Sequence, residues 1–301
     1  MPLDFDNSGV DVGGVDDRRG VGGGLAIGGG AGVVGLIIYL LVSVLGGGDG
    51  AGAGAQLPVG AGGAVQGQNA GESTQELRQR CNAEGALQEY TDCRLIKVYN
   101  VANDVWSAEF QRRGLPFERP RLSFFSGGTR TGCGNASASV GPFYCPPDQG
   151  IFLDLGFLQQ LQQQFGAQGQ FAQAYIMAHE YGHHLQTLLG TEPKVRAAQQ
   201  RNPGQANAYS VRLELQADCY AGVWSNLADA SEQNGINLTQ ENIAEAVNAA
   251  GAVGDDRIQR KAQGRVSPES FTHGTAQQRQ QWFVTGYRAG DLAACDTFAQ
   301  G

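Results

Sequence analysis

The sequence "MAHEYGHHLQ", residues 177–186, gathers three of the chain's 4 histidines around one glutamate. His179 and His183 are four residues apart, and residues at that spacing share one face of an α-helix. Two imidazoles placed in this way can bind one zinc ion through ring nitrogens at roughly 2.0–2.1 Å. The H-E-x-x-H pattern therefore predicts a metal site with Glu180 beside the first ligand, provided that the segment is helical.

The segment from residue 171 to 189 has the pattern of such a helix. It contains no proline, its apolar residues recur at helical spacing, and Gly190 followed by Pro193 supplies a stop. Gly182 costs about 1 kcal/mol relative to alanine in a helix interior. Its missing side chain would let another element approach the helix between the two histidines. A chance match on a buried helix is the alternative interpretation.

A hydrolytic zinc site needs a third protein ligand and one open position for water. His184 is a poor candidate because its side chain points about 100° around the helix from His183, so we expect it to be a surface or packing residue. The sequence "SVRLELQADCYAGVW", residues 210–224, predicts a second helix on which Glu214 and Asp218 face the same way. Glu214 would complete the ligand set, and Asp218 would accept the second ring N–H of a ligand histidine. A solvated acidic face is the alternative.

The segments before the motif predict an α+β fold. Residues 75–113 have the apolar spacing of two helices. Residues 121–127, 137–145 and 150–155 are short aromatic and β-branched runs bounded by glycine and proline, which predict a small antiparallel sheet. An exposed edge of such a sheet can pair with an extended peptide.

The fourth histidine, His273, lies in "ESFTHGTAQQRQQWF", residues 269–283. Thr275 and Gln278 form a plausible capping box for a following helix, which leaves His273 on the loop before it. An imidazole above the metal could stabilise the oxyanion of a tetrahedral intermediate. A packing residue at the helix entrance is the alternative. Asp255 and Asp256 are expected to be solvated or structural, with no role in the chemistry.

The ends of the chain have a different composition from its middle. The 301 residues are 41% hydrophobic, the formal net charge is −8, and the 46 glycines concentrate before about residue 75. The size predicts one substantial globular domain with additional segments, and the acidic charge argues against a nucleic-acid partner. Residues 1–24 are expected to be a disordered cytoplasmic tail, and residues 46–74 a flexible Gly/Ala-rich linker to a catalytic domain over 75–301.

Residues 25–45 carry no charge, and about 20 apolar residues are enough to cross a bilayer as a helix. Arg18 and Arg19 precede the segment, and no Lys or Arg follows until Arg78. This bias predicts a single-pass anchor in a bacterial cell membrane, with the N-terminus inside and the catalytic domain outside. A cleaved signal peptide is the alternative, because "AGAGA" at 51–55 offers small residues at the right spacing.

The 6 cysteines fit disulfides in an oxidising compartment. No C-x-x-C pair is present, and spacings of twelve are wrong for a zinc finger. Local spacing favours Cys81–Cys93 and Cys133–Cys145, which leaves Cys219 with Cys295.

The arrangement resembles gluzincin metallopeptidases, in which H-E-x-x-H is followed on a second helix by a ligand glutamate and an aspartate four residues later. "ELQAD", residues 214–218, looks like the E-x-x-A-D form of membrane-associated members. Residues from about 120 to 298 more closely resemble the bacterial "putative neutral zinc metallopeptidase" family. "DRRG" at 17–20, followed by an apolar segment, also matches that family's layout. The other matching stretches are "VGPFYCPPD", "FAQAYIMAHEYGHHLQTLLG", "VRLELQADCYAGVW", "GDDRIQ", "SFTHGT" and "ACDTF".

These patterns and the resemblance together predict a mostly helical, zincin-like α+β domain behind one transmembrane helix. We expect Zn²⁺ held by His179, His183 and Glu214, and a membrane-anchored peptidase acting on peptide or protein substrates. Glu180 would be the general base for an attacking water. The alternative is a non-catalytic envelope protein with a structural or vestigial zinc site. An intact Glu180 disfavours it, because a structural site has no use for a general base.

Overall fold

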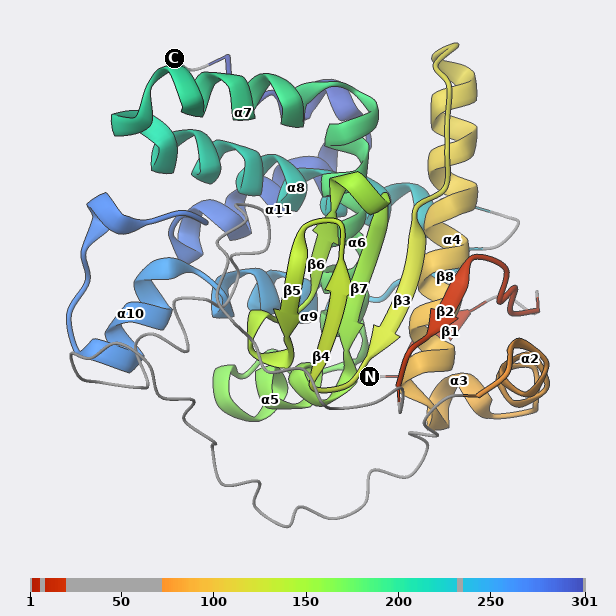
Figure 1. The fold of residues 1–301 in the computed structure, drawn as a ribbon. Coiled ribbons are helices and arrows are strands. Elements are labelled where there is room, and N and C mark those ends of the chain that lie inside the picture. The colour runs from red at the N-terminus through yellow and green to blue at the C-terminus, as the bar shows by residue number, and fades with distance from the viewer. Residues whose placement is uncertain (1, 6–8, 20–71, 232–234, 300–301) are drawn as a thin grey trace.

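Helices make up most of the chain that the structure describes. The structure is a computed structural model, and it describes residues 2–5, 9–19, 72–231 and 235–299. Predicted helices over 171–189 and 210–224 are confirmed as α6 and α8, whereas residues 75–113 form three helices rather than two. The helices are α2 (Thr74–Cys81), α3 (Ala86–Glu89), α4 (Thr91–Arg112), α5 (Leu155–Phe165), α6 (Gln170–Leu188), α7 (Thr191–Arg201), α8 (Ala206–Asp229), α9 (Gln240–Ala252), α10 (Asp255–Gln263) and α11 (Ala276–Ala289) (Figure 1).

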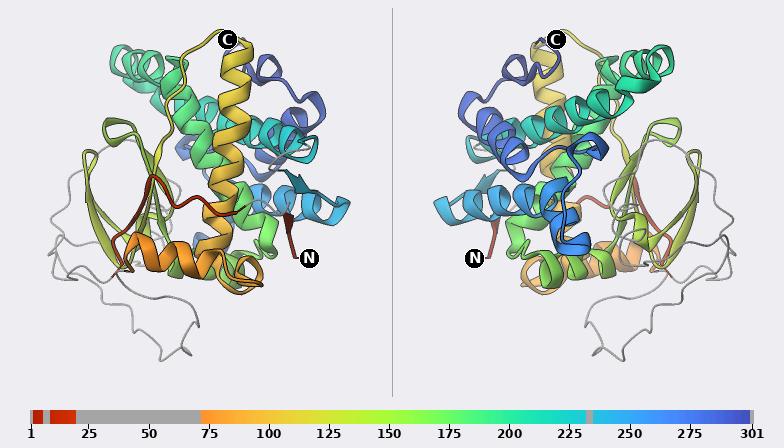
Figure 2. Two further views of the ribbon diagram at one scale, coloured as in Figure 1. Left: turned by 90° about the vertical axis from the view of Figure 1, so that its right-hand side faces the viewer. Right: turned by 90° about the vertical axis from the view of Figure 1, so that its left-hand side faces the viewer.

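In the described ranges, the strands form one four-stranded sheet and two strand pairs. The sheet has the order β2-β3-β7-β6, the pairs are β4-β5 and β1-β8, and Figure 2 shows the four-stranded sheet to one side of the helices. The strands are β1 (Asp4–Phe5), β2 (Val15–Asp17), β3 (Arg121–Phe125), β4 (Gly128–Thr131), β5 (Gly134–Ser137), β6 (Phe143–Cys145), β7 (Gly150–Asp154) and β8 (Ile236–Asn237).

The prediction of an antiparallel sheet is wrong for most of this sheet. β3 pairs in parallel with both β2 and β7, and only β6 and β7 pair antiparallel. The chain leaves β3 through the β4–β5 hairpin and returns through β6, so that β7 enters beside β3 in the same direction. Such a return depends on long-range pairing, which the apolar pattern of each strand does not encode.

The sheet has a hydrophobic core on each face. Leu122 and Ile151 belong to the main core, which they share with residues of α4, α6 and α8. On the other face, Phe125, Phe143 and Phe152 form a small core with Ala136 from the β4–β5 hairpin. The sheet is therefore held between the helical layer and its own hairpin.

Two close helix crossings place the helices that carry the predicted site. A Cβ atom on Gly182 of α6 would lie 3.1 Å from the Cα of Ala217 on α8, so α8 does cross α6 between the two motif histidines. A Cβ on Gly286 of α11 would lie only 1.9 Å from the carbonyl oxygen of Cys219 on α8. These glycines let the backbones of α6, α8 and α11 approach one another.

The prediction that residues 1–24 are disordered is wrong for residues 9–19. Strand β2 pairs with β3, Val12 is buried in the main core, and Arg19 is only 2% exposed. The Arg19 guanidinium forms ion pairs with Asp17 at 2.7 Å and with Asp92 of α4 at 2.8 Å. The low average hydrophobicity of this segment predicted disorder, but its charged side chains form ion pairs inside the fold.

The transmembrane helix in the predicted fold class is not supported. No helix in the described part of the chain is long and apolar enough to span a bilayer. The segment that carried the prediction, 25–45, lies outside the described residues, as does nearly all of the predicted linker 46–74.

All three predicted disulfides are confirmed, and no cysteine is free in the described residues. One joins α2 to α4, one joins the β4–β5 turn to β6, and one joins α8 to the 3₁₀ turn η5 (Leu292–Cys295). The pairs are Cys81–Cys93, Cys133–Cys145 and Cys219–Cys295.

Candidate metal centre

The structure brings together the three predicted metal ligands. Donor atoms of His179, His183 and Glu214 all lie within 4.8 Å of one another. His179 Nε2 is 3.1 Å from one oxygen of Glu214, and His183 Nε2 is 3.5 Å from the other. Two ligands bound to one tetrahedral zinc at about 2.0–2.2 Å are separated by about 3.3–3.5 Å. The two nitrogens and the carboxylate therefore have the spacing of a zinc ligand set.

The second nitrogen of each motif histidine has its own partner. His179 Nδ1 lies 2.9 Å from Asp218 Oδ1, as the sequence predicted for Asp218. His183 Nδ1 lies 2.9 Å from Oε1 of Gln186, for which the sequence predicted no role. These contacts hold both Nε2 atoms toward Glu214, and partners of this kind fix the orientation of ligand histidines.

Gln186 is itself fixed by the second helix. Its side chain is fully buried, and its Nε2 donates to the carbonyl oxygen of Leu213 at 2.7 Å and to Gln216 Oε1 at 3.2 Å. Its position three residues after His183, on the same helix face, was the available sequence signal.

Arg279 of α11 was also missed, and it completes the environment of Asp218. Its Nε and Nη2 donate to the two Asp218 oxygens at 2.8 and 2.9 Å, while the Tyr175 hydroxyl donates to the same carboxylate. Burial alone would raise the pKa of Asp218, but Arg279 and His179 hold it below its ordinary value. Asp218 thus stays ionised between the guanidinium and the ligand ring.

The charges of the ligand side chains and of their neighbours shift the pKa values of His179 and Glu214. Burial alone would lower the pKa of His179, but the Asp218 carboxylate outweighs it and raises that pKa to about 9. Burial would raise the pKa of Glu214, yet His183 and His179, with a further contribution from His273, hold it well below its usual range. Two ring nitrogens thus share protons with one carboxylate, where a divalent cation would replace those protons.

Glu180 follows His179 in the chain and is a buried carboxylate. It is only 1% exposed, and its Oε1 has no hydrogen-bond partner in the described structure. Burial raises the pKa of Glu180, and this outweighs the opposing influence of the neighbouring histidines. A buried carboxylate oxygen without a partner is costly unless another group, such as a water or a substrate atom, binds there.

His273 is held by a residue for which the sequence predicted no chemical role. Asp255 is buried rather than solvated, and one of its oxygens accepts the backbone N–H groups of Thr272, His273 and Gly274 at 2.8, 2.7 and 3.1 Å. Its other oxygen lies 3.0 Å from His273 Nδ1. The loop precedes α11, whose start is closed by the predicted capping box of Thr275 and Gln278.

This cage leaves one ring atom of His273 available. His273 Nε2 is buried and, like Glu180 Oε1, has no hydrogen-bond partner among the residues described. The His273 imidazole is also one of the groups that lower the pKa of Glu214. A convergent N, N, O donor set beside two buried polar atoms without partners fits a zinc ion with an open position for water and substrate.

His184 is a packing residue, one of the two roles expected for it, and it is fully buried. Its Nε2 donates to the Glu118 carbonyl oxygen at 2.7 Å, and its Nδ1 accepts from the Tyr144 hydroxyl at 3.0 Å. Burial lowers the pKa of His184 to about 4, so the ring is neutral near pH 7. These hydrogen bonds join α6 to β6 of the sheet and to the segment that precedes β3.

Comparison with known proteins agrees with this geometry. The family described as "Putative neutral zinc metallopeptidase" matches residues 7–298. The chain belongs to this family. The match begins within the N-terminal segment that carries β2, so this segment is part of the family's common sequence.

Relatives in this family span most of the chain. "Uncharacterized protein YpfJ" of Escherichia coli K12 is 42% identical over 292 residues, which cover 95% of this chain and 96% of the relative. "Uncharacterized protein Rv2575" of Mycobacterium tuberculosis H37Rv is 45% identical over 228 residues, which cover 73% of this chain and 75% of the relative. No solved structure matches the chain.

Proposed function

We propose that the protein is a zinc-dependent endopeptidase. The observation that carries the proposal is Glu180, whose buried Oε1 has no partner in the described structure and which lies beside the His179–His183–Glu214 group. A zinc ion bound there would lower the pKa of its water towards about 7 and polarise the scissile carbonyl. Membership of a zinc metallopeptidase family supports the same activity.

The protein's own residues would divide the remaining chemistry. Glu180 would take the proton of the attacking water and pass it to the leaving amine, a role suited to a carboxylate whose pKa burial raises. His273 would donate from Nε2 to the substrate oxygen on which negative charge develops. Asp255 would hold that ring in place and balance its charge when both nitrogens carry protons.

The substrate would be an extended peptide. β6 is one outer strand of the four-stranded sheet, and Tyr144 in this strand bonds to His184 on α6, the helix that carries the metal site. A peptide that pairs with such an edge gains main-chain hydrogen bonds regardless of its sequence.

The alternative, a non-catalytic envelope protein with a structural zinc site, leaves two features without a purpose. Structural zinc sites are closed by four protein ligands. Here the described residues supply three, and the buried polar atoms of Glu180 and His273 remain without partners.

The activity can be tested on the full-length protein. It should cleave a diverse peptide library after zinc loading, lose cleavage on treatment with a chelator, and recover it when zinc is returned. A zinc-loaded protein that cleaves no member of the library would favour the structural alternative.

We also propose that the domain folds in an oxidising, extracytoplasmic compartment. The three disulfides support this location, because cytosolic thiols are normally kept reduced. Alkylation of the denatured protein, taken directly from cells, should find no free thiol. Six reactive thiols would contradict the proposal.

A further inference from the structure

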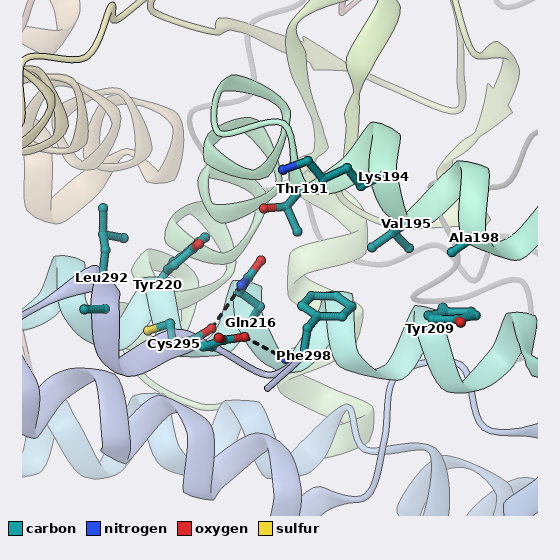
Figure 3. A pocket seen from close by; sticks show the side chains of 12 residues that line it. Thr191, Lys194, Val195, Ala198, Tyr209, Gln216, Tyr220, Leu292, Cys295 and Phe298 are labelled. Carbon is teal, nitrogen blue, oxygen red and sulfur yellow. Dashed lines mark hydrogen bonds between the residues drawn. The ribbon is translucent and has the colours of Figure 1, made fainter. Parts of the chain in front are cut away.

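A cavity lies between α7, α8 and η5, and Gln216 is among the side chains that line it (Figure 3). Its volume is about 550 Å³, within the range of roughly 300–1,000 Å³ of small-molecule sites. Its walls are largely apolar and aromatic, a composition typical of sites that take a hydrophobic group. They are formed by Val195, Ala198, Tyr209, Tyr220, Leu292 and Phe298.

Three polar side chains on these walls have atoms that no described residue binds; Tyr220 is buried, whereas Lys194 and Asp296 are exposed. Tyr220 is only 4% exposed, and its hydroxyl makes no hydrogen bond with any described residue. Lys194 lines the cavity and forms no ion pair within the described ranges, and Figure 3 shows its side chain above Gln216. Asp296 accepts the N–H groups of Phe298 and Ala299 with Oδ1 only, at 3.0 Å each.

This set of groups selects a class of ligand. An ammonium and a carboxylate on the walls of one apolar cavity complement a molecule with both charges and a hydrophobic side chain. We propose that the cavity binds a free hydrophobic amino acid in its zwitterionic form. Its carboxylate would pair with Lys194 and its ammonium with Asp296, while its side chain would lie against the apolar wall.

The cavity is joined to the metal site by two amides. Gln216 lines the cavity and donates from Nε2 to the carbonyl oxygen of Cys295 at 3.0 Å. Its Oε1 accepts from Gln186 Nε2 at 3.2 Å, and Gln186 Oε1 lies 2.9 Å from Nδ1 of the ligand histidine His183. A ligand that shifts Gln216 therefore acts on the orientation of His183.

This connection makes binding at the two sites reciprocal. If the amino acid changes the affinity for zinc by some factor, zinc changes the affinity for the amino acid by the same factor, typically about 5–150-fold in coupled sites. Binding in the cavity does not depend on the peptidase activity. A ligand of this class would also control cleavage, as an end product of peptide breakdown. Only this consequence rests on the proposed function.

Calorimetric titration of the full-length protein with L-leucine tests the ligand class. Leucinamide and N-acetyl-leucine each lack one of the two charges, so each should bind about tenfold more weakly or worse. Lys194→Gln should weaken leucine binding by a similar factor, and Ala198→Trp should block the cavity. Arg201→Gln, which removes an exposed cation from the same helix but outside the cavity, should bind leucine like the wild type.

The zinc connection is tested by repeating the titration with and without zinc. Wild type and Glu180→Gln should both show leucine affinities that differ at least about fivefold between the two states. Gln186→Met should bind leucine with the same affinity with and without zinc, because Gln186 joins Gln216 to His183 but does not line the cavity.

A wild type that binds no leucine at millimolar concentration, or a Lys194→Gln variant that binds it normally, would overturn the proposed amino-acid site. Equal wild-type affinities with and without zinc would overturn the connection. Because Glu180→Gln is included, neither outcome depends on cleavage.

Discussion

Replacing Asp255 by asparagine removes one charge from the pocket that holds His273, with little change of shape. The amide oxygen can still accept the three backbone N–H groups of the loop, but the amide nitrogen then faces His273 Nδ1. Burial alone would raise the pKa of Asp255, yet its hydrogen bond with His273 lowers it, so the native residue is a carboxylate at neutral pH. The substitution therefore removes the group that balances a doubly protonated imidazole.

The size of the effect follows from the bond that is lost. A hydrogen bond to a charged group contributes about 1.5–3 kcal/mol, which corresponds to about 10- to 150-fold in kcat if the bond acts in the transition state. Complete removal of an oxyanion donor, as in His273→Ala, costs about 10²–10³-fold and sets the upper limit. Zinc content should not change, because Asp255 contacts none of the three predicted ligands.

The neighbouring acid provides a matched control. Asp256 is half-buried, and its Oδ1 accepts the N–H of Ala276 at 2.7 Å, which an asparagine oxygen can also do. Asp256→Asn should therefore change kcat by no more than about twofold. The assay is the turnover of one library-derived peptide by the two variants at equal zinc content. Equal rates for Asp255→Asn and Asp256→Asn, or loss of zinc from Asp255→Asn alone, would refute this role of Asp255.

Three further predictions concern the ligands and the N-terminal segment. In zinc titrations, Glu214→Ala should abolish zinc binding, and Asp218→Ala should weaken it by about 10–100-fold. A Glu214→Ala variant that binds zinc like the wild type would place the third ligand elsewhere. Because the folded-state pKa of His179 is raised to about 9, the metal-free ring is protonated at pH 7. Zinc affinity should then rise about tenfold per pH unit between pH 7 and 9, because zinc must displace this proton. Calorimetry in two buffers should show at least one proton released per zinc. A pH-independent affinity would contradict the assignment of His179 as a ligand. In denaturant unfolding, Arg19→Met should lower the free energy of unfolding by about 3–5 kcal/mol, because it breaks a buried ion pair. Arg18→Met should lower it by no more than about 1 kcal/mol, because the partner of Arg18, Asp16, is exposed. Equal losses would argue against the buried packing of this segment.

The parts of the site that the sequence predicted are those encoded within single helices. His179 and His183 share a face of α6, and Glu214 and Asp218 share a face of α8, because a spacing of four residues fixes their directions locally. Gly182 indicated where the second helix would cross the first. The three disulfides could also be inferred, since two of them close short local loops.

The parts that were missed depend on contacts between distant segments. Arg279 reaches Asp218 only because α11 packs against α8 at Gly286. Asp255 reaches His273 only because the chain between α10 and α11 folds back onto the start of α10. The parallel pairing of β2 with β3 joins residues more than a hundred positions apart, and no local pattern in a glycine-rich segment predicts such a partner.

The central claim is that Glu180 acts as the base for hydrolysis at a zinc held by His179, His183 and Glu214. The most direct test measures zinc content and peptide turnover for wild type and Glu180→Gln, side by side. The glutamine keeps the shape of the side chain but not its basicity, so the variant should retain about one zinc per chain and lose at least about 10²–10⁴-fold in turnover. A Glu180→Gln protein that binds zinc and cleaves as fast as the wild type would contradict the claim.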